Sequence, residues 1–300
     1  MNTRSEPVPG YDLAAGHFTI AGSPVGAGYG TRSPWSFETR VEAAAAAGYS
    51  SIGLGEADYS GMRAAGVTDD ELLEVLDRHG VWVSEIEFLF DWMHDDDDAR
   101  IPAAIAENLY QMAAVFRPDH VNMGDVRFPP GRSMEVLADR YGAVCDRLAP
   151  FGVKAAIEFM PWTSIPDLDT ACEIIERAGR ENAGIDLDTW HYFRGPSDPD
   201  QLARVDPSLI LAVALNDAGP PLDDVVLDTS RHRLLPGEGI FDLEGFLRAL
   251  AETGATPMMG VEVLSDRQTA MHPSEAARVS YDAASAVLAR AGWPGDAEGP

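Results

Sequence analysis

Three carboxylates stand where buried strands are expected to end. Glu158 follows the apolar run 155–157, Asp188 closes a run that begins at Ala183, and Glu262 lies within 261–263. Such apolar runs are typical of parallel strands covered on both faces, and the carboxyl ends of these strands meet at one edge, where the chemistry of such folds takes place. Divalent cations favour oxygen ligands, so the three acids together predict a metal site.

Other polar side chains fall at the same strand ends. Glu85 and Glu87 share one face of a strand, where they are either directed into a pocket or paired. Asp186 and Asp188 also share a face, and Asp188 is preferred as the ligand because it lies nearer the strand end. His191, three residues further on, can turn back over the same edge. The remaining strand-end groups are Glu56, Asp125, Asn216 and Asp217.

A glycine-rich turn, Pro-Gly-Glu-Gly at 236–239, follows the seventh expected strand. Its backbone N–H groups are either available to a phosphate or used in a plain turn before the next helix. Arg233, just upstream, is the cation most easily placed over an anionic or polyhydroxylated substrate.

The elements that position these groups alternate along the chain. Strands are predicted at 17–20, 51–54, 81–88, 120–123, 209–215 and 258–263, and the two runs that end in Glu158 and Asp188 make eight. One helix is predicted from an N-cap at Ser33 to Gly48, and another from a capping box at Thr68 and Glu71 to Gly80. Further helices are predicted at 101–116, 134–151, 166–180, 198–203, 241–253 and 273–291.

Strand and helix in alternation predict a parallel sheet, and eight such units in 300 residues predict an α/β fold, the (β/α)₈ TIM barrel. We expect one domain at 12–291, a flexible N-terminal arm at 1–11 and a disordered tail at 292–300. A doubly wound open sheet is the alternative fold. The first turn, 21–26, does not carry the glycine pattern that binds dinucleotides in that fold.

The chain is strongly acidic: 22 Lys and Arg against 49 Asp and Glu give a net charge of −27. Such a charge repels phosphate backbones and anionic lipid surfaces, so we expect neither nucleic-acid nor membrane binding. The two cysteines, Cys145 and Cys172, lack metal-ligand spacing, and neither a signal segment nor an apolar span is evident. These features favour a soluble cytoplasmic protein with unpaired thiols.

The chain resembles the sugar phosphate isomerase/epimerase family, the xylose isomerase-like TIM barrels. The matching segments are Ile-Glu-Phe-Met-Pro-Trp at 157–162, Asp-Thr-Trp-His at 188–191, Asn-Asp-Ala at 216–218, Arg-Leu-Leu-Pro-Gly-Glu-Gly at 233–239 and Val-Glu-Val at 261–263. Their order and spacing carry the resemblance, which covers nearly the whole chain.

The resemblance implies one divalent metal, with Mn²⁺ favoured over Mg²⁺, Co²⁺ or Zn²⁺, bound by Glu158, Asp188 and Glu262. The family's strand-seven ligand is a histidine or glutamine, and that position holds Ala214 here. The fourth metal ligand is then water, His191 or Asn216. Residues expected to contact substrate are His191, Arg233, Glu87 and Trp162.

Members of the family remove a proton α to a carbonyl, while a metal or protein group stabilises the enolate. We therefore expect a metal-assisted isomerase or epimerase acting on a sugar or related polyhydroxy carbonyl compound, in which Glu158 and Glu262 act as base and acid. The alternatives are a lyase of the inosose- or dehydroshikimate-dehydratase type, an enzyme that opens 3-keto-glycosides by elimination, and a metal-less binding subunit. A homo-oligomer is also expected.

Overall fold

The computed structural model describes residues 11–25, 32–90, 92–93, 103–125, 132–196 and 200–294. Eight parallel strands close into a barrel, because β1 pairs with β2 on one side and with β10 on the other. The single-domain (β/α)₈ prediction is confirmed. The barrel strands are β1 (Leu13–Ala15), β2 (Ser51–Gly55), β3 (Trp82–Leu89), β4 (His120–Met123), β5 (Lys154–Glu158), β6 (Ala183–Asp188), β7 (Ile210–Leu215) and β10 (Met258–Val261).

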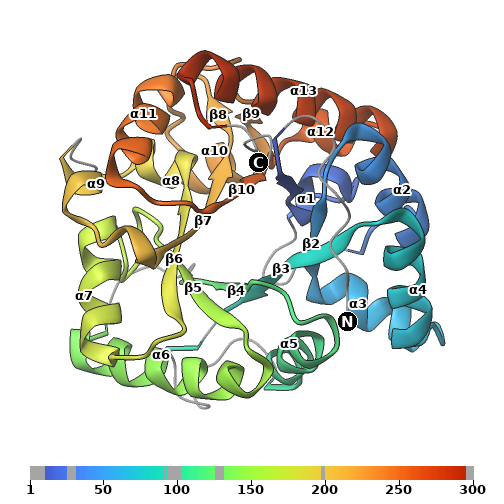
Figure 1. Ribbon diagram of the computed structural model, residues 1–300, viewed down its shortest axis with the longest axis horizontal. Helices are drawn as coiled ribbons and strands as arrows, with labels where there is room; N and C mark the ends of the chain where they lie inside the picture. Colours follow the sequence, from blue (N-terminus) through green and yellow to red (C-terminus); the bar gives the residue numbers. More distant parts are fainter. Residues whose placement is uncertain are drawn as a thin grey trace, which may run out of the picture.

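Helices form a ring around the strands (Figure 1). The longer ones are α2 (Phe37–Ala47), α3 (Glu56–Ala64), α4 (Asp69–His79), α5 (Ala103–Phe116), α6 (Met134–Leu148), α7 (Leu168–Ala178), α11 (Leu243–Thr253) and α13 (Pro273–Ala291). Shorter elements are α1 (His17–Ile20), η1 (Ala149–Phe151), α8 (Thr189–Arg194), α9 (Gln201–Arg204), η2 (Pro207–Leu209), α10 (Val225–Arg231) and α12 (Asp266–Thr269), with a hairpin of β8 (Asp217–Ala218) and β9 (Arg233–Leu234).

Several helix boundaries follow from capping residues that the sequence indicates. The predicted capping box of α4 is present: Thr68 Oγ1 accepts from the Glu71 N–H, and the Glu71 carboxylate accepts from the Thr68 N–H. Gly80 ends that helix in the left-handed conformation that glycine adopts without strain. The prediction for the last helix, 273–291, matches α13 at both ends.

Two predictions near the N-terminus are wrong. Residues 17–20 form helix α1 instead of a strand, and β1 lies just before them at Leu13–Ala15. Apolar runs as short as four residues fit either period, and here β1 ends at Ala15 and Gly16 is the N-cap of α1. The second helix begins at Phe37, with Ser36 as its N-cap. Ser33, the predicted cap, instead donates to the Ala21 carbonyl at 2.6 Å.

The two terminal predictions fall mostly outside the described residues. Of the expected arm 1–11 only Tyr11 is described, and of the expected tail 292–300 only residues 292–294 are. Gly292 caps α13, and Trp293 donates its N–H to the Leu288 carbonyl and packs against the core.

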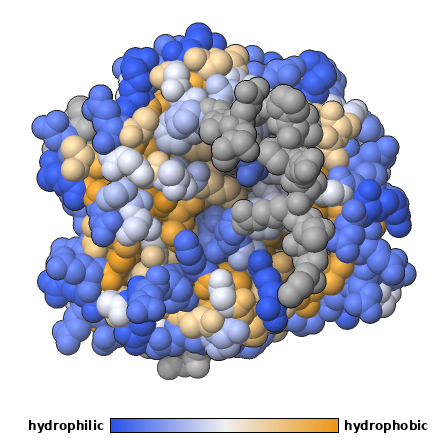
Figure 2. Space-filling view, in the orientation of Figure 1, coloured by the Kyte–Doolittle hydropathy of each residue, from blue (hydrophilic) through white to orange (hydrophobic). Residues whose placement is uncertain are grey.

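The outer surface is dominated by hydrophilic residues, with apolar side chains visible between them (Figure 2). Among the helices of the described ranges, none combines the length and the apolar character that crossing a lipid bilayer requires. Cys145 and Cys172 are both free thiols.

Tyr141 joins the helical ring to the barrel. It lies on α6 and is fully buried, and its hydroxyl donates to the Ala155 carbonyl of β5 at 2.8 Å. The same hydroxyl accepts from the Gly184 N–H of β6 at 2.9 Å. One side chain therefore serves two adjacent strands, the pair that ends in Glu158 and Asp188.

We expect Tyr141→Phe to lower the free energy of unfolding by about 1–3 kcal/mol, because it leaves buried strand groups without a partner. Urea denaturation of the full chain measures this loss. Tyr59→Phe is the matched control: its ring is buried too, but its hydroxyl donates to the partly exposed Asp69, where water replaces the bond. Equal losses in the two variants would contradict this view of Tyr141.

Candidate active site

Glu158 ends β5 and is almost fully buried. Its Oε1 lies 3.2 Å from His191 Nε2, and its Oε2 accepts from Asn122 Nδ2 at 3.1 Å. The strand-end glutamate and the histidine of α8 are thus in direct contact, as the sequence led us to expect for groups meeting at one edge of the barrel.

Asp188 ends β6 and is also the N-cap of α8. Its Oδ1 accepts from the Trp190 and His191 N–H groups at 2.7 and 3.1 Å, which fixes the start of the helix that carries the histidine. Its Oδ2 accepts from Asn216 Nδ2 at 3.0 Å and from Arg233 Nη1 at 2.6 Å. Burial alone raises the pKa of Asp188, but Arg233 and His191 outweigh it and hold that pKa below its usual value.

Arg233 lies at the centre of the cluster with only 2% of its surface exposed. Its Nη1 donates to Asp188 and, at 2.9 Å, to Glu262 Oε2. Its Nε and Nη2 donate to the carbonyl and the hydroxyl of Thr229, both at 2.9 Å. Nη2 also lies 3.4 Å from His191 Nε2. Every nitrogen of the guanidinium therefore has a protein partner.

Glu262 follows β10, and its side chain is 15% exposed, more than that of Asp188 or Arg233. Burial raises its pKa well above the usual value; Arg233 opposes this, and Glu158 and Glu87 add to it. The same guanidinium thus outweighs burial at Asp188 but not at Glu262, so the pKa values of the two acids are shifted in opposite directions.

Glu85 and Glu87 lie on β3 and face one another as well as the interior. Burial raises the pKa of Glu85 to about 6 and that of Glu87 well above its usual value, and the hydrogen bond between them lowers the pKa of Glu85 while it raises that of Glu87. Glu87 Oε1 also accepts from the His17 N–H at 2.8 Å. A Cβ on Gly53 would stand 2.6 Å from an oxygen of each glutamate, so only glycine leaves room for the pair.

The structure also shows the surroundings of three other residues that the sequence singles out. Trp162 is half-buried, with its ring 5.5 Å from the His191 ring. Asn216 Oδ1 accepts from the Thr189 hydroxyl at 3.1 Å, which leaves its amide to position Asp188. Asp217 accepts from the N–H groups of Gly237 and Gly239, so the glycine-rich turn uses those donors within the protein instead of offering them to a phosphate.

Sequence reasoning missed Asn122 and His120. Asn122 Nδ2 donates to both Glu158 and Asp186, at 3.1 and 3.0 Å, and so connects β4 with β5 and β6. The alternation of side chains along a strand could have found both, because His120 and Asn122 share a face of β4. Of the other strand-end groups, Glu56 begins α3 and accepts from Asn108.

The arrangement fits a divalent cation. Glu158, Asp188 and His191 each offer a ligand atom, and these atoms lie within 4.8 Å of one another. Two carboxylates and an imidazole form a ligand set that first-row divalent metals accept. Ala214 does lie on β7 and lines a cavity beneath this group. Glu262, the third ligand that the sequence predicts, is not part of this group, and its Oε2 accepts from Arg233 Nη1.

Comparison with known proteins gives a consistent picture. A family model described as the xylose isomerase-like TIM barrel matches residues 41–286. Among solved structures, a zinc-bound form of the protein IolI superposes with a TM-score of 0.80 at 20% identity, covering 93% of this chain and 98% of that one. An L-ribulose 3-epimerase superposes with a TM-score of 0.68 at 16% identity, covering 94% and 95%. At these identities the likeness concerns the fold alone.

Curated relatives are similar over shorter stretches. A 3-dehydroshikimate dehydratase of Pseudomonas aeruginosa is 33% identical over 133 residues, which is 44% of this chain and 21% of the relative. An inosose isomerase of Bacillus subtilis is 30% identical over 135 residues, 44% of this chain and 46% of the relative. The matches thus span about half or less of these relatives' own length.

Replacing Arg233 tests how the cluster is held together. We expect Arg233→Met to lower the free energy of unfolding by about 3–5 kcal/mol, because it leaves the buried Asp188 without its cation. The control, Arg177→Met, breaks an exposed pair with Glu173, for which less than about 1 kcal/mol is expected. Chemical denaturation of both variants makes the comparison, and similar small losses would show that Arg233 does not organise the site.

Proposed function

The chain belongs to the xylose isomerase-like TIM barrel family, and from this premise we propose that it is a metal-assisted isomerase or epimerase of a sugar or related polyhydroxy carbonyl compound. The reaction begins with removal of a proton α to the substrate carbonyl. The proposal extends beyond the family assignment, because related barrels catalyse several outcomes of that first step.

One observation carries the proposal: Glu158 and Glu262 reach the same buried network from strands that are not neighbours. Glu158 ends β5 and Glu262 follows β10, and these strands are separated in the barrel by β6 and β7. Glu158 contacts His191, Glu262 contacts Arg233, and the histidine and arginine contact each other. In this proposal a substrate bound over the network lies between the two carboxylates, so that one removes a proton and the other returns one, as epimerisation requires.

The remaining residues have supporting roles in this proposal. Glu158, Asp188 and His191 would hold the cation, for which Mn²⁺ is our first choice among Mn²⁺, Mg²⁺, Co²⁺ and Zn²⁺. A bound cation supplies stabilisation of the enolate oxygen. Arg233 keeps Asp188 ionised and Glu262 in place, and contacts substrate only by giving up one of its protein partners. Glu87 and Trp162 border the same space and are candidates to bind substrate hydroxyl groups.

A lyase is the second candidate, and the similarity to a 3-dehydroshikimate dehydratase favours it. Elimination of water, or of an aryl group from a 3-keto-glycoside, starts with the same proton removal. A metal-less binding subunit remains the candidate from another class, motivated by Ala214. Small-molecule binding without turnover, in protein that takes up no metal, would favour it. That the chain forms a homo-oligomer also stays a prediction.

The function is tested by incubating the full chain with ketoses, keto-inositols and keto-glycosides in D₂O, with and without Mn²⁺. NMR then detects deuterium at the α carbon and identifies the product. An isomer or epimer carrying deuterium supports the proposal, whereas loss of water or of an aryl group assigns the lyase. Absence of both exchange and product across the panel would contradict proton abstraction.

We expect Glu158→Gln and Glu262→Gln to slow α-proton exchange by about 10²–10⁴-fold at saturating metal, because each removes a base or acid and keeps the shape of the side chain. Glu56→Gln is the control: this glutamate is equally buried but accepts from Asn108, away from the cluster. If both cluster variants keep near-wild-type exchange while binding metal, neither glutamate moves the proton, and Glu87 or His191 becomes the candidate base.

A further inference from the structure

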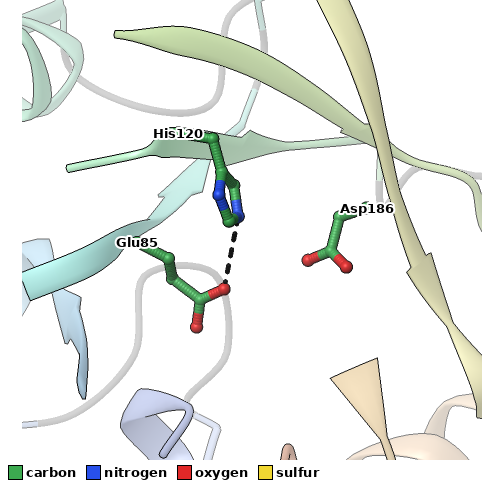
Figure 3. Close-up of side chains that lie close together, drawn as sticks. All are labelled: Glu85, His120 and Asp186. Atoms are coloured by element: carbon green, nitrogen blue, oxygen red, sulfur yellow. Dashed lines mark ion pairs between the residues drawn. The ribbon is translucent and has the colours of Figure 1, made fainter. Parts of the chain in front are cut away.

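A second group of potential ligands lies deeper in the barrel than the one described above. Glu85 on β3, His120 on β4 and Asp186 on β6 point toward one another (Figure 3), and each offers a ligand atom within 4.8 Å of the others. Glu85 Oε2 lies 3.4 Å from His120 Nε2. His120 precedes Asn122 by two residues on β4, so it sits roughly 6–7 Å further from the mouth.

The polar atoms of this group are buried and incompletely bonded. His120 is 0% exposed and Asp186 2%. Within the described part of the chain, neither ring nitrogen of His120 has a hydrogen-bond partner, and neither does Asp186 Oδ1. The amide oxygen of the neighbouring Asn122 also has no hydrogen-bond partner among the described residues. Buried groups of this kind nearly always have a partner, and leaving one unbonded costs about 1–3 kcal/mol. Several such atoms together point to an occupant.

The barrel reserves space beside these atoms. Most TIM barrels fill their interior with layers of branched apolar side chains. Here Glu85, Asp186 and Asn122 border a small cavity whose opposite wall is formed by Ala214, Gly260 and Gly16. Crowding does not require a glycine at 260, because a Cβ there would meet nothing closer than 3.5 Å. Small residues leave space where larger apolar ones would have closed it.

The buried acids of this group also favour a cation. Glu85 and Asp186 are both buried, and Arg233 is already engaged by Asp188 and Glu262. Buried carboxylates are retained when they are paired or when they coordinate a metal. Asn122, which donates to Glu158 and to Asp186, connects this layer to the group at the mouth.

We propose that Glu85, His120 and Asp186 form a second metal site, which binds a divalent first-row transition ion beneath the one assigned to Glu158, Asp188 and His191. An imidazole with two carboxylates selects such an ion over Mg²⁺ or Ca²⁺, which favour oxygen ligands alone. With both sites filled, the barrel holds a two-metal centre with Asn122 between the ions. The deeper ion offsets the charge of the buried acids and holds Asp186 and Asn122 in position beneath Glu158.

Metal content tests the proposal without reference to activity. The full chain is stripped with EDTA, loaded with excess Zn²⁺, passed through gel filtration and measured by elemental analysis. Wild type is expected to retain two ions per chain, and His120→Gln and Glu85→Gln one. Asp188→Asn also retains one, since it disrupts the upper site alone, and His120→Gln combined with Asp188→Asn retains none. Glu56→Gln, a buried glutamate outside both groups, keeps two and controls for binding to the acidic surface.

Anomalous diffraction from zinc-loaded crystals locates the ion directly, with a peak expected about 2.0–2.2 Å from His120 Nε2 and from an oxygen of Glu85 and of Asp186. The proposal is overturned if wild type retains no ion, or one ion that His120→Gln keeps, or if water alone occupies the cavity. A single ion that is lost in His120→Gln and kept in Asp188→Asn would support the deeper site and count against the metal in the proposed function.

If a variant is less stable than wild type, melting curves recorded with and without Zn²⁺ test metal binding instead. The metal-dependent rise in Tm is expected to shrink in His120→Gln and not in Glu56→Gln.

Discussion

The buried guanidinium of Arg233 is the constraint on which the upper part of the site depends. It bonds to Asp188 and Glu262 and is held by Thr229, so two acids from different strands share one cation. Asp188 in turn caps α8, the helix that carries His191. The position of the histidine over Glu158 therefore follows from the same ion pair. Arg233 thus holds Glu262 on one side, while the capped helix holds His191 next to Glu158 on the other.

Small residues are as important to this barrel as its charged ones. Gly53 leaves room for the carboxylates of Glu85 and Glu87, and Ala214 stands where relatives of this fold were expected to carry a larger ligand. A histidine at 214 would have projected into the cavity bordered by Asp186 and Glu262. Ala214 and the deeper acids Glu85 and Asp186 line this same cavity. The small side chain at 214 therefore leaves open volume next to the deeper group.

The sequence was sufficient for the fold because eight apolar runs alternate with helical patterns, and because the capping box of α4 and the bounds of α13 could be predicted directly. It also identified the strand-end acids, since Glu158 and Asp188 follow long apolar runs. It was insufficient for 17–20, where four residues do not establish a period. It also could not reveal that Asp217 takes up the N–H groups of the glycine-rich turn, or that Arg233 bonds to Asp188. Those contacts join segments 20 and 45 residues apart through the fold, and spacing along the chain contains no record of them. His120 was read only as a strand residue because its partners lie on other strands.

The carboxylates alone do not decide between isomerisation and elimination. In the proposed mechanism both reactions begin with the same proton removal, so the placement of Glu158 and Glu262 is compatible with either. The difference lies in which atom receives the second proton: a carbon in isomerisation, the departing oxygen in elimination. In this proposal the choice depends on how the substrate is held, and therefore on the candidate substrate-binding residues Trp162 and Glu87. Burial raises the pKa of Glu262 above its usual value despite Arg233, which favours a proton-donor role for this glutamate in either reaction. The two reaction classes are then separated by the way the substrate is bound and not by the pair of glutamates.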